Sequence, residues 1–293
     1  MQKENQPLAE VFGHLPTDFS PKAIRYRRNK LCPFNNQIPN CTKDKAKDPL
    51  GVCSIYNREG AVITCPVRFR EDWLVADDAA DFFFSEGAIW TSLTEVRLTD
   101  FDGKSAGNID VVLVAYDRDG RVYDFGSLEI QAVYISGNVR NPFTHYMSDC
   151  EANAAMDWTH QPNYPRPDFH SSSRKRLAPQ LMFKGGILQA WNKKMAVALD
   201  SAFYNTLPDL TEVPKSEAEV AWLVYDLVLD ANATRYQLTR TKVVYTKFSE
   251  ALNAITRPKV GRIEDFMNLL QSKVDEKQEL PPTNKIVENP FEG

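Results

Sequence analysis

Long apolar runs are missing from this chain of 293 residues. A helix that spans a bilayer needs about 18 consecutive apolar residues. The longest apolar candidates, IDVVLVAY and AWLVYDLVL, have only the length of strands. The N-terminal stretch MQKENQPLAEVFGH has neither the basic segment nor the apolar segment of a secretion signal. We therefore expect a cytoplasmic protein that does not enter a membrane.

Motifs of several common enzyme classes are also missing. No Walker or Rossmann glycine pattern occurs, which argues against ATP-driven or NAD-driven chemistry. No histidine has a neighbouring His or Asp at a ligand spacing such as H-E-x-x-H, which argues against an HNH nuclease or a histidine-based metal hydrolase. With 43% hydrophobic and 25% charged residues, the composition is that of a globular protein with one large domain or two modest ones.

The charge is unevenly distributed along the chain. A net charge of -4 argues weakly against a general nucleic-acid binder. However, the segment PKAIRYRRNK (21–30) is basic and contains no acid, whereas residues 71–86 are acidic and contain no base. A local basic stripe is enough to contact phosphates. The alternative interpretation of residues 21–30 is a solvated helix face.

Four of the 5 cysteines lie early in the chain, with the spacing C-x8-C-x11-C-x11-C: Cys32, Cys41, Cys53 and Cys65. Clustered cysteines in a reducing compartment are more often metal ligands than disulfides, although this spacing lacks the tight C-x2-C unit. Nearby Pro and Gly residues would let the thiolates converge from turns on a tetrahedral site. Zn²⁺ and iron both accept such a site. The alternative is four separately buried thiols.

Apolar periodicity beyond the cysteines predicts both helices and strands. We expect helices over residues 75–95, 184–207 and 263–274. We expect strands over residues 96–103, 107–116, 121–135, 218–229 and 236–248. Residues 136–183 are expected to be irregular, and the tail 276–293 to be extended. The sequence therefore predicts an α/β (α+β) fold that contains both helices and strands.

A hairpin carries the most informative residues. Residues 107–116 and 121–135 flank a strong turn signal, D-R-D-G. The stretch FGSLEIQAVYI places Glu129 and Gln131 on one face of an otherwise apolar strand. Asp110 is a similar isolated acid on the first strand. One extra residue at Gly126–Ser127, a plausible bulge, would bring Asp110 level with Leu128 or Glu129.

Two carboxylates at the end of an apolar face repel each other unless a cation lies between them. Mg²⁺ relieves this repulsion and takes oxygen ligands, waters and substrate phosphate oxygens. Asp110 and Glu129, with Gln131 beside them, therefore predict a site for metal-assisted phosphodiester hydrolysis. The alternative is that Asp110 caps a strand and Glu129 pairs with a nearby Arg or Lys.

The order helix, strand, Asp-bearing strand, E-x-[KQ]-bearing strand, helix, strand resembles the PD-(D/E)xK nuclease core, which implies a mixed central sheet flanked by helices. The pattern CPF…C…GVCS…GAVITCP, followed by GNID and SLEIQAVYISGN, resembles the NotI-type type II restriction endonucleases from about Cys32 to Asn138. The resemblance implies a four-cysteine metal-binding module at 1–72, a nuclease core at 73–274 with an insertion at about 136–183, and a C-terminal tail at 275–293.

The resemblance also implies roles for individual residues. The four early cysteines would hold one iron ion, with zinc as the alternative, and Asp110 and Glu129 would hold the catalytic Mg²⁺. Gln131 takes the place of the usual Lys; it cannot supply positive charge or act as a base at neutral pH, but its amide could orient the attacking water. Glu95 fits an additional acid near a helix end, and its alternative is a solvated Glu.

The activity implied by the resemblance is Mg²⁺-dependent, sequence-specific cleavage of double-stranded DNA that leaves 5′-phosphates. The family implies a homodimer, a GC-rich palindrome containing GGCC, and a cognate DNA methyltransferase in the same cell. A repair or structure-specific nuclease on the same core and a non-enzymatic, metal-stabilised DNA-binding protein remain alternatives. Basic residues are the candidate DNA contacts: Arg25, Arg27, Arg28, Arg166, Arg174, Lys175, Arg176 and Lys184.

Overall fold

The computed structural model describes residues 5–279 except 37, 46, 231, 233 and 259. The chain forms two compact units, of which the first ends at Thr256 and the second begins at Arg257. The second unit contains the helix α9 (Ile263–Glu279). Among the described residues, no helix is both long enough and apolar enough to cross a membrane.

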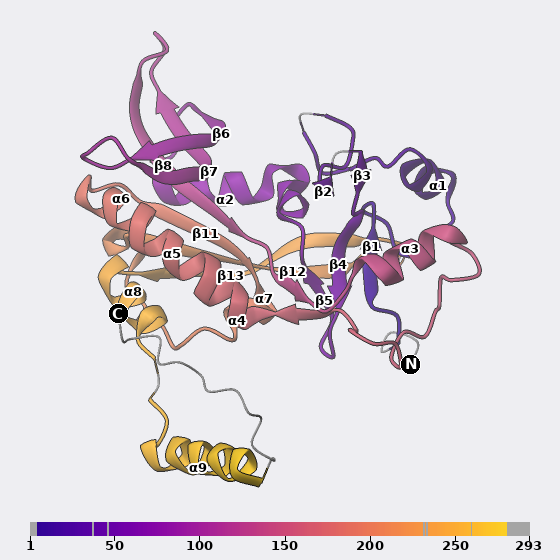
Figure 1. Cartoon of the computed structure of the whole chain (residues 1–293). Helices are drawn as coiled ribbons and strands as arrows, with labels where there is room; N and C mark the ends of the chain where they lie inside the picture. The colour runs from indigo at the N-terminus through magenta and orange to yellow at the C-terminus, as the bar shows by residue number, and fades with distance from the viewer. Residues whose placement is uncertain are drawn as a thin grey trace. The chain divides into compact units, whose positions relative to one another are not determined.

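A mixed sheet of six strands forms the centre of the first unit, in the order β13-β12-β11-β8-β7-β6 (Figure 1). The strands are β6 (Trp90–Thr99), β7 (Ser105–Tyr116), β8 (Val122–Gln131), β11 (Met195–Asp200), β12 (Val220–Leu229) and β13 (Tyr236–Thr246). The strands β8, β11 and β12 are mutually parallel, and every other neighbouring pair is antiparallel. The predicted mixed sheet with both α and β elements is thus confirmed.

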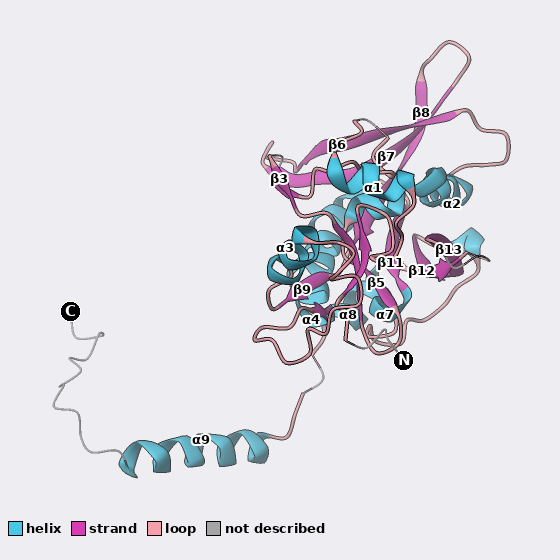
Figure 2. Ribbon diagram, turned by 90° about the vertical axis from the view of Figure 1, so that its right-hand side faces the viewer, coloured by secondary structure: helices cyan, strands magenta, loops and turns pink. Residues whose placement is uncertain are grey.

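Helices cover both faces of this sheet, as expected for parallel strands that are apolar at successive positions. On one face, Val75, Ala79 and Phe82 of α2 (Leu74–Phe83) join the core of the sheet. On the other face, the core includes residues of a helical segment at 169–190 and of α8 (Phe248–Thr256). Figure 2 shows the same arrangement from the side.

The segment 169–190 is a run of consecutive helical turns. It comprises α4 (Phe169–Ser172), α5 (Ala178–Gln180) and α6 (Gly186–Ala190), joined by π-helical turns at Ser173–Leu177 and Leu181–Gly185. We call it the 169–190 helix. The Asp168 carboxylate caps its start by accepting a hydrogen bond from Ser171 N at 2.9 Å.

Two predictions fail in this region. Residues 136–183 are not irregular, because they include most of the 169–190 helix and also α3 (Arg140–Ser148). Residues 184–207 are not one helix, because they contain the helix end, strand β11 and the short helix α7 (Ser201–Tyr204). Every residue of β11 is buried. Its apolar side chains therefore do not alternate with polar ones, and periodicity alone cannot distinguish such a strand from a buried helix.

The predicted helix at 75–95 is wrong in its second half. Helix α2 ends at Phe83, and Gly87, with φ 80°, precedes the edge strand β6. The predicted strand at 121–135 stops at Gln131. The predicted strands at 107–116, 218–229 and 236–248 are confirmed as β7, β12 and β13. The predicted helix at 263–274 is confirmed and continues to Glu279, so the tail begins as helix; residues 280–293 lie outside the described part of the chain.

A second sheet lies in the N-terminal part of the first unit. It consists of β1 (Leu8–Val11), β4 (Val52–Tyr56) and β5 (Ala61–Ile63). The N-terminal part also contains α1 (Pro21–Arg28), β2 (Asp44–Lys45), β3 (Asp48–Pro49) and a 3-10 helix (Pro66–Trp73). Three further short elements lie later in the chain: β9 (Tyr134–Ser136), β10 (Arg166–Asp168) and a 3-10 helix (Lys215–Glu217).

The N-terminal sheet is tied to the rest of the first unit. Leu8 and Val52 share a buried cluster with Phe143 and Tyr146 of α3. Val133 N, just beyond β8, donates a hydrogen bond to Ile63 O at 2.9 Å. Residues up to Thr256 therefore form one compact unit. The boundary at residue 72, between a metal-binding module and a nuclease core, stays a prediction.

Candidate active site

The β7–β8 hairpin places Asp110 beside Glu129. Val111 pairs with Leu128, so Asp110 is level with Glu129 one step further along the two strands. Directly opposed residues lie about 5 Å apart. The extra residue that this register requires is present, but it lies near the turn, between the pairs Ala115↔Asp124 and Tyr116↔Val122, and not at the predicted Gly126–Ser127.

Glu95 extends this row of acids onto a third strand. The pairs Thr94↔Val111 and Val96↔Ile109 flank it, which places it opposite Asp110. Its φ of 56° lies in the left-handed region, which is costly for a residue with a Cβ. The predicted helix end is wrong, because Glu95 belongs to an edge strand and is exposed. It nevertheless lies beside Asp110 in the sheet. We call Glu95, Asp110 and Glu129 the acid row.

Glu129 is fully buried, with 0% of its surface exposed. Burial and the neighbouring Asp110 together raise its pKa to about 8, and Lys184 opposes the shift. Lys184 Nζ donates to Glu129 Oε2 at 2.7 Å. The alternative interpretation, in which Glu129 pairs with a nearby Lys, is thus correct as far as the pairing goes. Lys184, 5% exposed, is not available as the DNA contact that was predicted.

Asp110 is half-buried and is tied to the neighbouring strand. Its Oδ2 accepts a hydrogen bond from the backbone N–H of Ile130 at 2.9 Å. Burial raises the pKa of Asp110, and this hydrogen bond and Lys184 lower it. The carboxylate is therefore held by one of its oxygens from the backbone of β8.

Gln131 lies two residues beyond Glu129 on the same face of β8. Its Nε2 donates to Gln180 Oε1 on the 169–190 helix. Within the described part of the chain, Gln131 Oε1 and Glu129 Oε1 are buried and have no hydrogen-bond partner. Buried acceptors without partners are costly. Two such oxygens beside Asp110 fit a hard cation, which takes oxygen ligands.

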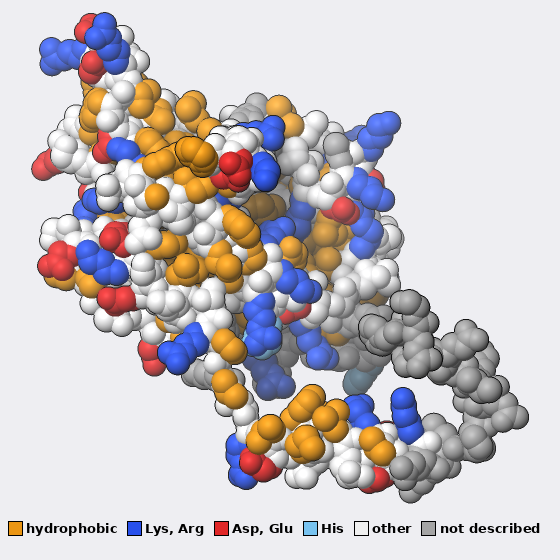
Figure 3. All heavy atoms as spheres, turned by 60° about the vertical axis from the view of Figure 1, so that its left-hand side comes forward, with side chains coloured by type: hydrophobic (Ala, Val, Ile, Leu, Met, Phe, Trp, Pro, Cys, Tyr) orange, Lys and Arg blue, Asp and Glu red, His pale blue; other side chains and the backbone are white. Residues whose placement is uncertain are grey.

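A cavity of about 680 Å³ adjoins the acid row. Glu95, Asp110 and Gln131 line one part of it, and Lys175 and Arg176 of the 169–190 helix line another. Its remaining lining includes residues of the N-terminal part: Asn35, Ile38, Thr42, Pro66, Val67 and Arg70. Figure 3 shows a hollowed face of the first unit with Lys and Arg side chains around it. The cavity thus combines acids with cations suited to a phosphate backbone.

The other predicted DNA contacts differ in accessibility. Arg25 and Arg28 of α1 are exposed, as is Arg174, which precedes the cavity-lining Lys175 in the chain. Arg27 is 4% exposed and donates to Asp18 O and Leu15 O at 2.7 and 2.5 Å. The prediction of Arg27 as a DNA contact is therefore wrong, because the residue faces inward on the helix.

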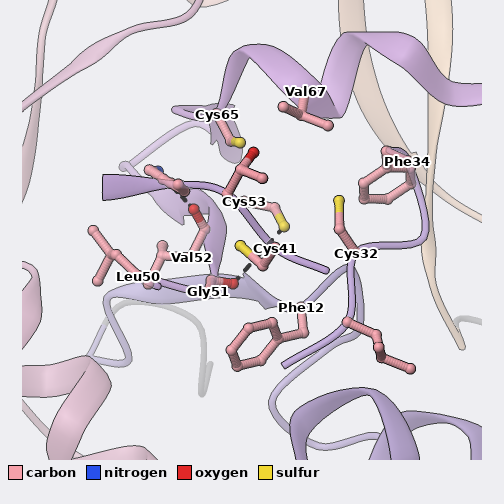
Figure 4. Close-up of a pocket in the computed structure, with 13 residues that line it drawn as sticks. Phe12, Cys32, Phe34, Cys41, Leu50, Gly51, Val52, Cys53, Cys65 and Val67 are labelled. Carbon is pink, nitrogen blue, oxygen red and sulfur yellow. Dashed lines mark hydrogen bonds between the residues drawn. The ribbon is translucent and has the colours of Figure 1, made fainter. Parts of the chain in front are cut away.

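The four early cysteines surround one small cavity (Figure 4). Cys53 lies on β4, Cys65 follows β5, and Cys32 and Cys41 flank the bridge between Leu31 and Asn40. The volume, about 10 Å³, is roughly that of one water-sized sphere. All four thiols are free of disulfides. Thiols that face one such space suit a single ion with soft ligands.

Burial favours the protonated form of three of these thiols: Cys32, Cys41 and Cys53. It raises the pKa of Cys32 to about 11 and also raises the pKa of Cys41 and Cys53, and the neighbouring thiols add to each shift. Among the described residues, no group of three or more His, Cys, Asp or Glu side chains is spaced as a metal site as it stands. Iron or zinc at the cysteines and Mg²⁺ at the acid row therefore stay predictions.

The sequence-based prediction missed Gln180 of the 169–190 helix, which contacts Gln131. It singled out Lys184 as a DNA contact and not as the partner of Glu129. Residues four apart, such as Gln180 and Lys184, are neighbours on the surface of a helix. The sequence could indicate this pair only if a helix were predicted over these residues.

Comparison with known proteins identifies the family. A family model described as restriction endonuclease NotI matches residues 17–238 of the chain. This match includes the cysteines, the acid row and the 169–190 helix. No curated protein matches the chain.

Proposed function

Because the chain belongs to the NotI family of restriction endonucleases, and is thus a type II, site-specific deoxyribonuclease that acts on double-stranded DNA, we propose that the acid row is its hydrolytic site. One observation carries the proposal: adjacent strands bring Glu95, Asp110 and Glu129 side by side, and Glu95 and Asp110 line a cavity that also has basic residues in its wall. This arrangement also supports a PD-(D/E)xK core.

Asp110 and Glu129 would hold Mg²⁺, which would neutralise charge on the scissile phosphate and help to activate water. The Ile130 N–H orients Asp110 for this task. Glu129 Oε1, buried and without a partner among the described residues, is the oxygen that would face the ion. Glu95, directly across from Asp110, would complete the set of acids.

Gln131 takes no charge, so it cannot act as a base. The hydrogen bond from its Nε2 to Gln180 fixes the amide and leaves Oε1 as an acceptor. That oxygen could accept a hydrogen bond from the attacking water and so align it with the phosphorus. The products would carry 5′-phosphates and 3′-hydroxyls.

Recognition would involve the basic residues near the cavity and on α1. Lys175 and Arg176 line the cavity, and Arg174, Arg25 and Arg28 are exposed. We propose a GC-rich palindrome containing GGCC as the site and a homodimer as the active form, because a twofold DNA site matches a twofold protein. A cognate methyltransferase would protect the same site in the host.

The four cysteines would hold iron, with zinc as the alternative, as a structural ion. They lie on the loops and strands that carry Thr42, Pro66 and Val67 to the cavity. An ion there would fix the N-terminal wall of the cavity and contribute no chemistry to hydrolysis.

Digestion of a long, unmethylated DNA of known sequence tests the proposal. Wild type, Asp110→Ala and Glu129→Ala are incubated with Mg²⁺, and the ends are mapped by sequencing. Discrete ends at one palindrome, absent in both variants, support the proposal. Cuts only at branched DNA would indicate the repair nuclease, and binding without cleavage would indicate the non-enzymatic protein.

A further inference from the structure

Lys184 is a buried ammonium beside a buried carboxylate. Its Nζ lies 2.7 Å from Glu129 Oε2, and the side chains of Lys184 and Glu129 are 7% and 0% exposed. Burying a charge is costly unless it is paired. The other oxygen, Oε1, is buried and has no hydrogen-bond partner in the described part of the chain. The lysine thus holds one oxygen of the carboxylate and leaves the second one for another ligand.

The 169–190 helix and strand β8 are matched in spacing at this point. Glu129 and Gln131 are two residues apart on one face of a strand, which is about 6.6 Å. Lys184 follows Gln180 by four residues, which is about one turn of the 169–190 helix. Each strand residue therefore meets one helix residue: Glu129 contacts Lys184, and Gln131 contacts Gln180.

The backbone around Lys184 is irregular and tightly packed. Lys184 belongs to the π-helical turn Leu181–Gly185, and such turns frequently occur at functional sites. Gly185 lies against α8, where an added Cβ would come within 2.3 Å of Phe248 Cε2. Close packing on that side holds the turn against the protein and fixes the direction in which Lys184 leaves the helix.

We propose that Lys184 is a positioning residue of the active site, which holds Glu129 by Oε2 so that Oε1 faces the catalytic cation. It supplies from a helix the positive charge that Gln131 does not supply from the strand. The inference rests on the proposed function of the acid row. A lysine that served only as a counter-ion for Glu129 would instead compete with the metal ion for the carboxylate.

Three substitutions separate these roles: Lys184→Met, Lys184→Gln and Lys184→Arg. Lys215→Met is the matched control, because Lys215 also pairs with a carboxylate, Asp81 at 3.0 Å, but at an exposed position. The measurements are single-turnover cleavage with Mg²⁺, DNA affinity with Ca²⁺, and Mn²⁺ affinity of the DNA-free protein by calorimetry. Thermal unfolding identifies any variant that does not fold.

Lys184→Met is expected to lower the maximal cleavage rate on the order of 10²–10³-fold, the usual effect of removing one group that supports transition-state charge. DNA affinity should stay close to that of wild type, so the loss appears in kcat and not in KM. Lys184→Arg should restore part of the rate, because it keeps the charge. Mn²⁺ affinity should fall in Lys184→Met, since Glu129 is no longer oriented.

Two results would overturn the proposal while leaving the acid row in place. One is a Lys184→Met protein that cleaves at the wild-type rate while Glu129→Ala is inactive. The other is tighter Mn²⁺ binding in the Lys184 variants, which would show competition and not positioning. If Lys184→Met does not fold, Lys184→Gln tests the charge alone, because its amide can still donate to Glu129. A wild-type cleavage rate and a wild-type Mn²⁺ affinity in Lys184→Gln would then show that the site does not need the charge of Lys184. Wild-type cleavage that survives Glu129→Ala would instead refute the proposed function itself.

Discussion

The backbone N–H of Ile130 donates a hydrogen bond to Asp110 Oδ2 across the hairpin, at 2.9 Å. This bond links the carboxylate of β7 to the residue that follows Glu129 on β8. Burial raises the pKa of both acids in the absence of a cation. The hairpin register therefore places the two carboxylates side by side, and an added positive charge would stabilise this arrangement.

The first prediction concerns Asp110→Asn. The amide keeps the acceptor for Ile130 N but removes the charge, so we expect cleavage to fall on the order of 10²–10³-fold or more. The melting temperature without metal should stay equal or rise, because one of two neighbouring negative charges is gone. Cleavage assays and thermal unfolding in EDTA measure these two effects.

Asp119→Asn is the control for this prediction, because Asp119 lies exposed in the turn of the same hairpin. It should cleave and unfold like wild type. An Asp110→Asn protein that cleaves normally would show that Asp110 holds no part of the catalytic charge.

The second prediction is a pH dependence of stability that comes from Glu129. Its pKa of about 8 in the folded, metal-free protein lies above the ordinary value of 4.5 for a glutamate. Between these values the folded state binds more protons than the unfolded state, so the free energy of unfolding decreases as pH rises. Melting temperatures in EDTA from about pH 5.5 to 8.5, which lies mostly within that window, should therefore fall more steeply in wild type than in Glu129→Gln. Parallel curves would contradict the prediction.

The hairpin could be predicted because its information is local. Alternating side chains and the D-R-D-G turn placed Asp110 and Glu129 on one face, and the one-residue shift in register was expected. The site of that shift was not predictable, because the strands around Tyr116 and Val122 carry no glycine or proline at the extra residue. Local pattern thus determines the face but not the position of the irregularity.

The 169–190 helix could not be predicted, because its identity depends on tertiary contacts. Its basic stretch SSSRKR and the pair Gly185–Gly186 are typical of loops, yet Leu177, Leu181 and Leu188 bury the helix against the sheet. Strand β11 was mistaken for helix since burial on both faces removes the alternation that marks a strand. The sequence therefore predicts Lys184, the partner of Glu129, at the start of a helix over residues 184–207. In the structure, Lys184 instead lies near the end of the 169–190 helix, before strand β11.

The third prediction concerns the four-cysteine cavity. Purified protein should contain about one iron or zinc ion per chain, as a tetrahedral four-thiolate site binds one ion. Cys53→Ser should lose the metal and melt at a lower temperature, because metal binding and folding are coupled. Elemental analysis and thermal unfolding are the measurements. Cys150→Ser is the control and should keep the metal, since Cys150 does not line this cavity.

The fourth prediction distinguishes two kinds of arginine on α1. Arg25→Ala and Arg28→Ala should each weaken DNA binding and lower the slope of log affinity against log salt concentration by about one. Arg27→Ala should instead lower stability, because Arg27 satisfies the carbonyls of Asp18 and Leu15 and lies over the ring of Tyr146. Fluorescence anisotropy at several salt concentrations and thermal unfolding separate the effects. Equal behaviour of Arg25→Ala and Arg27→Ala would contradict this assignment.

The fifth prediction concerns Arg68, which joins the N-terminal sheet to the central one. Its Nε donates to Glu10 Oε1 at 3.0 Å, its Nη1 donates to Glu71 at 2.8 Å, and its Nη2 donates to the carbonyl of Tyr236 on β13 at 3.1 Å. Its guanidinium lies over the ring of Phe34, two residues from Cys32. Both Arg68 and Glu10 are fully buried.

Arg68→Met should destabilise the protein by about 3–5 kcal/mol, because it leaves the buried Glu10 without its cation. The double variant Arg68→Met with Glu10→Gln should recover part of that loss, since no unpaired charge remains. Arg240→Met is the control, because its pair with Asp78 is nearly half exposed on the arginine side and contributes roughly 0–1 kcal/mol, as surface pairs do. Urea unfolding measures all three. If the double variant is no more stable than Arg68→Met, then the carbonyl of Tyr236 and the ring of Phe34, and not the charge of Glu10, are what Arg68 chiefly serves.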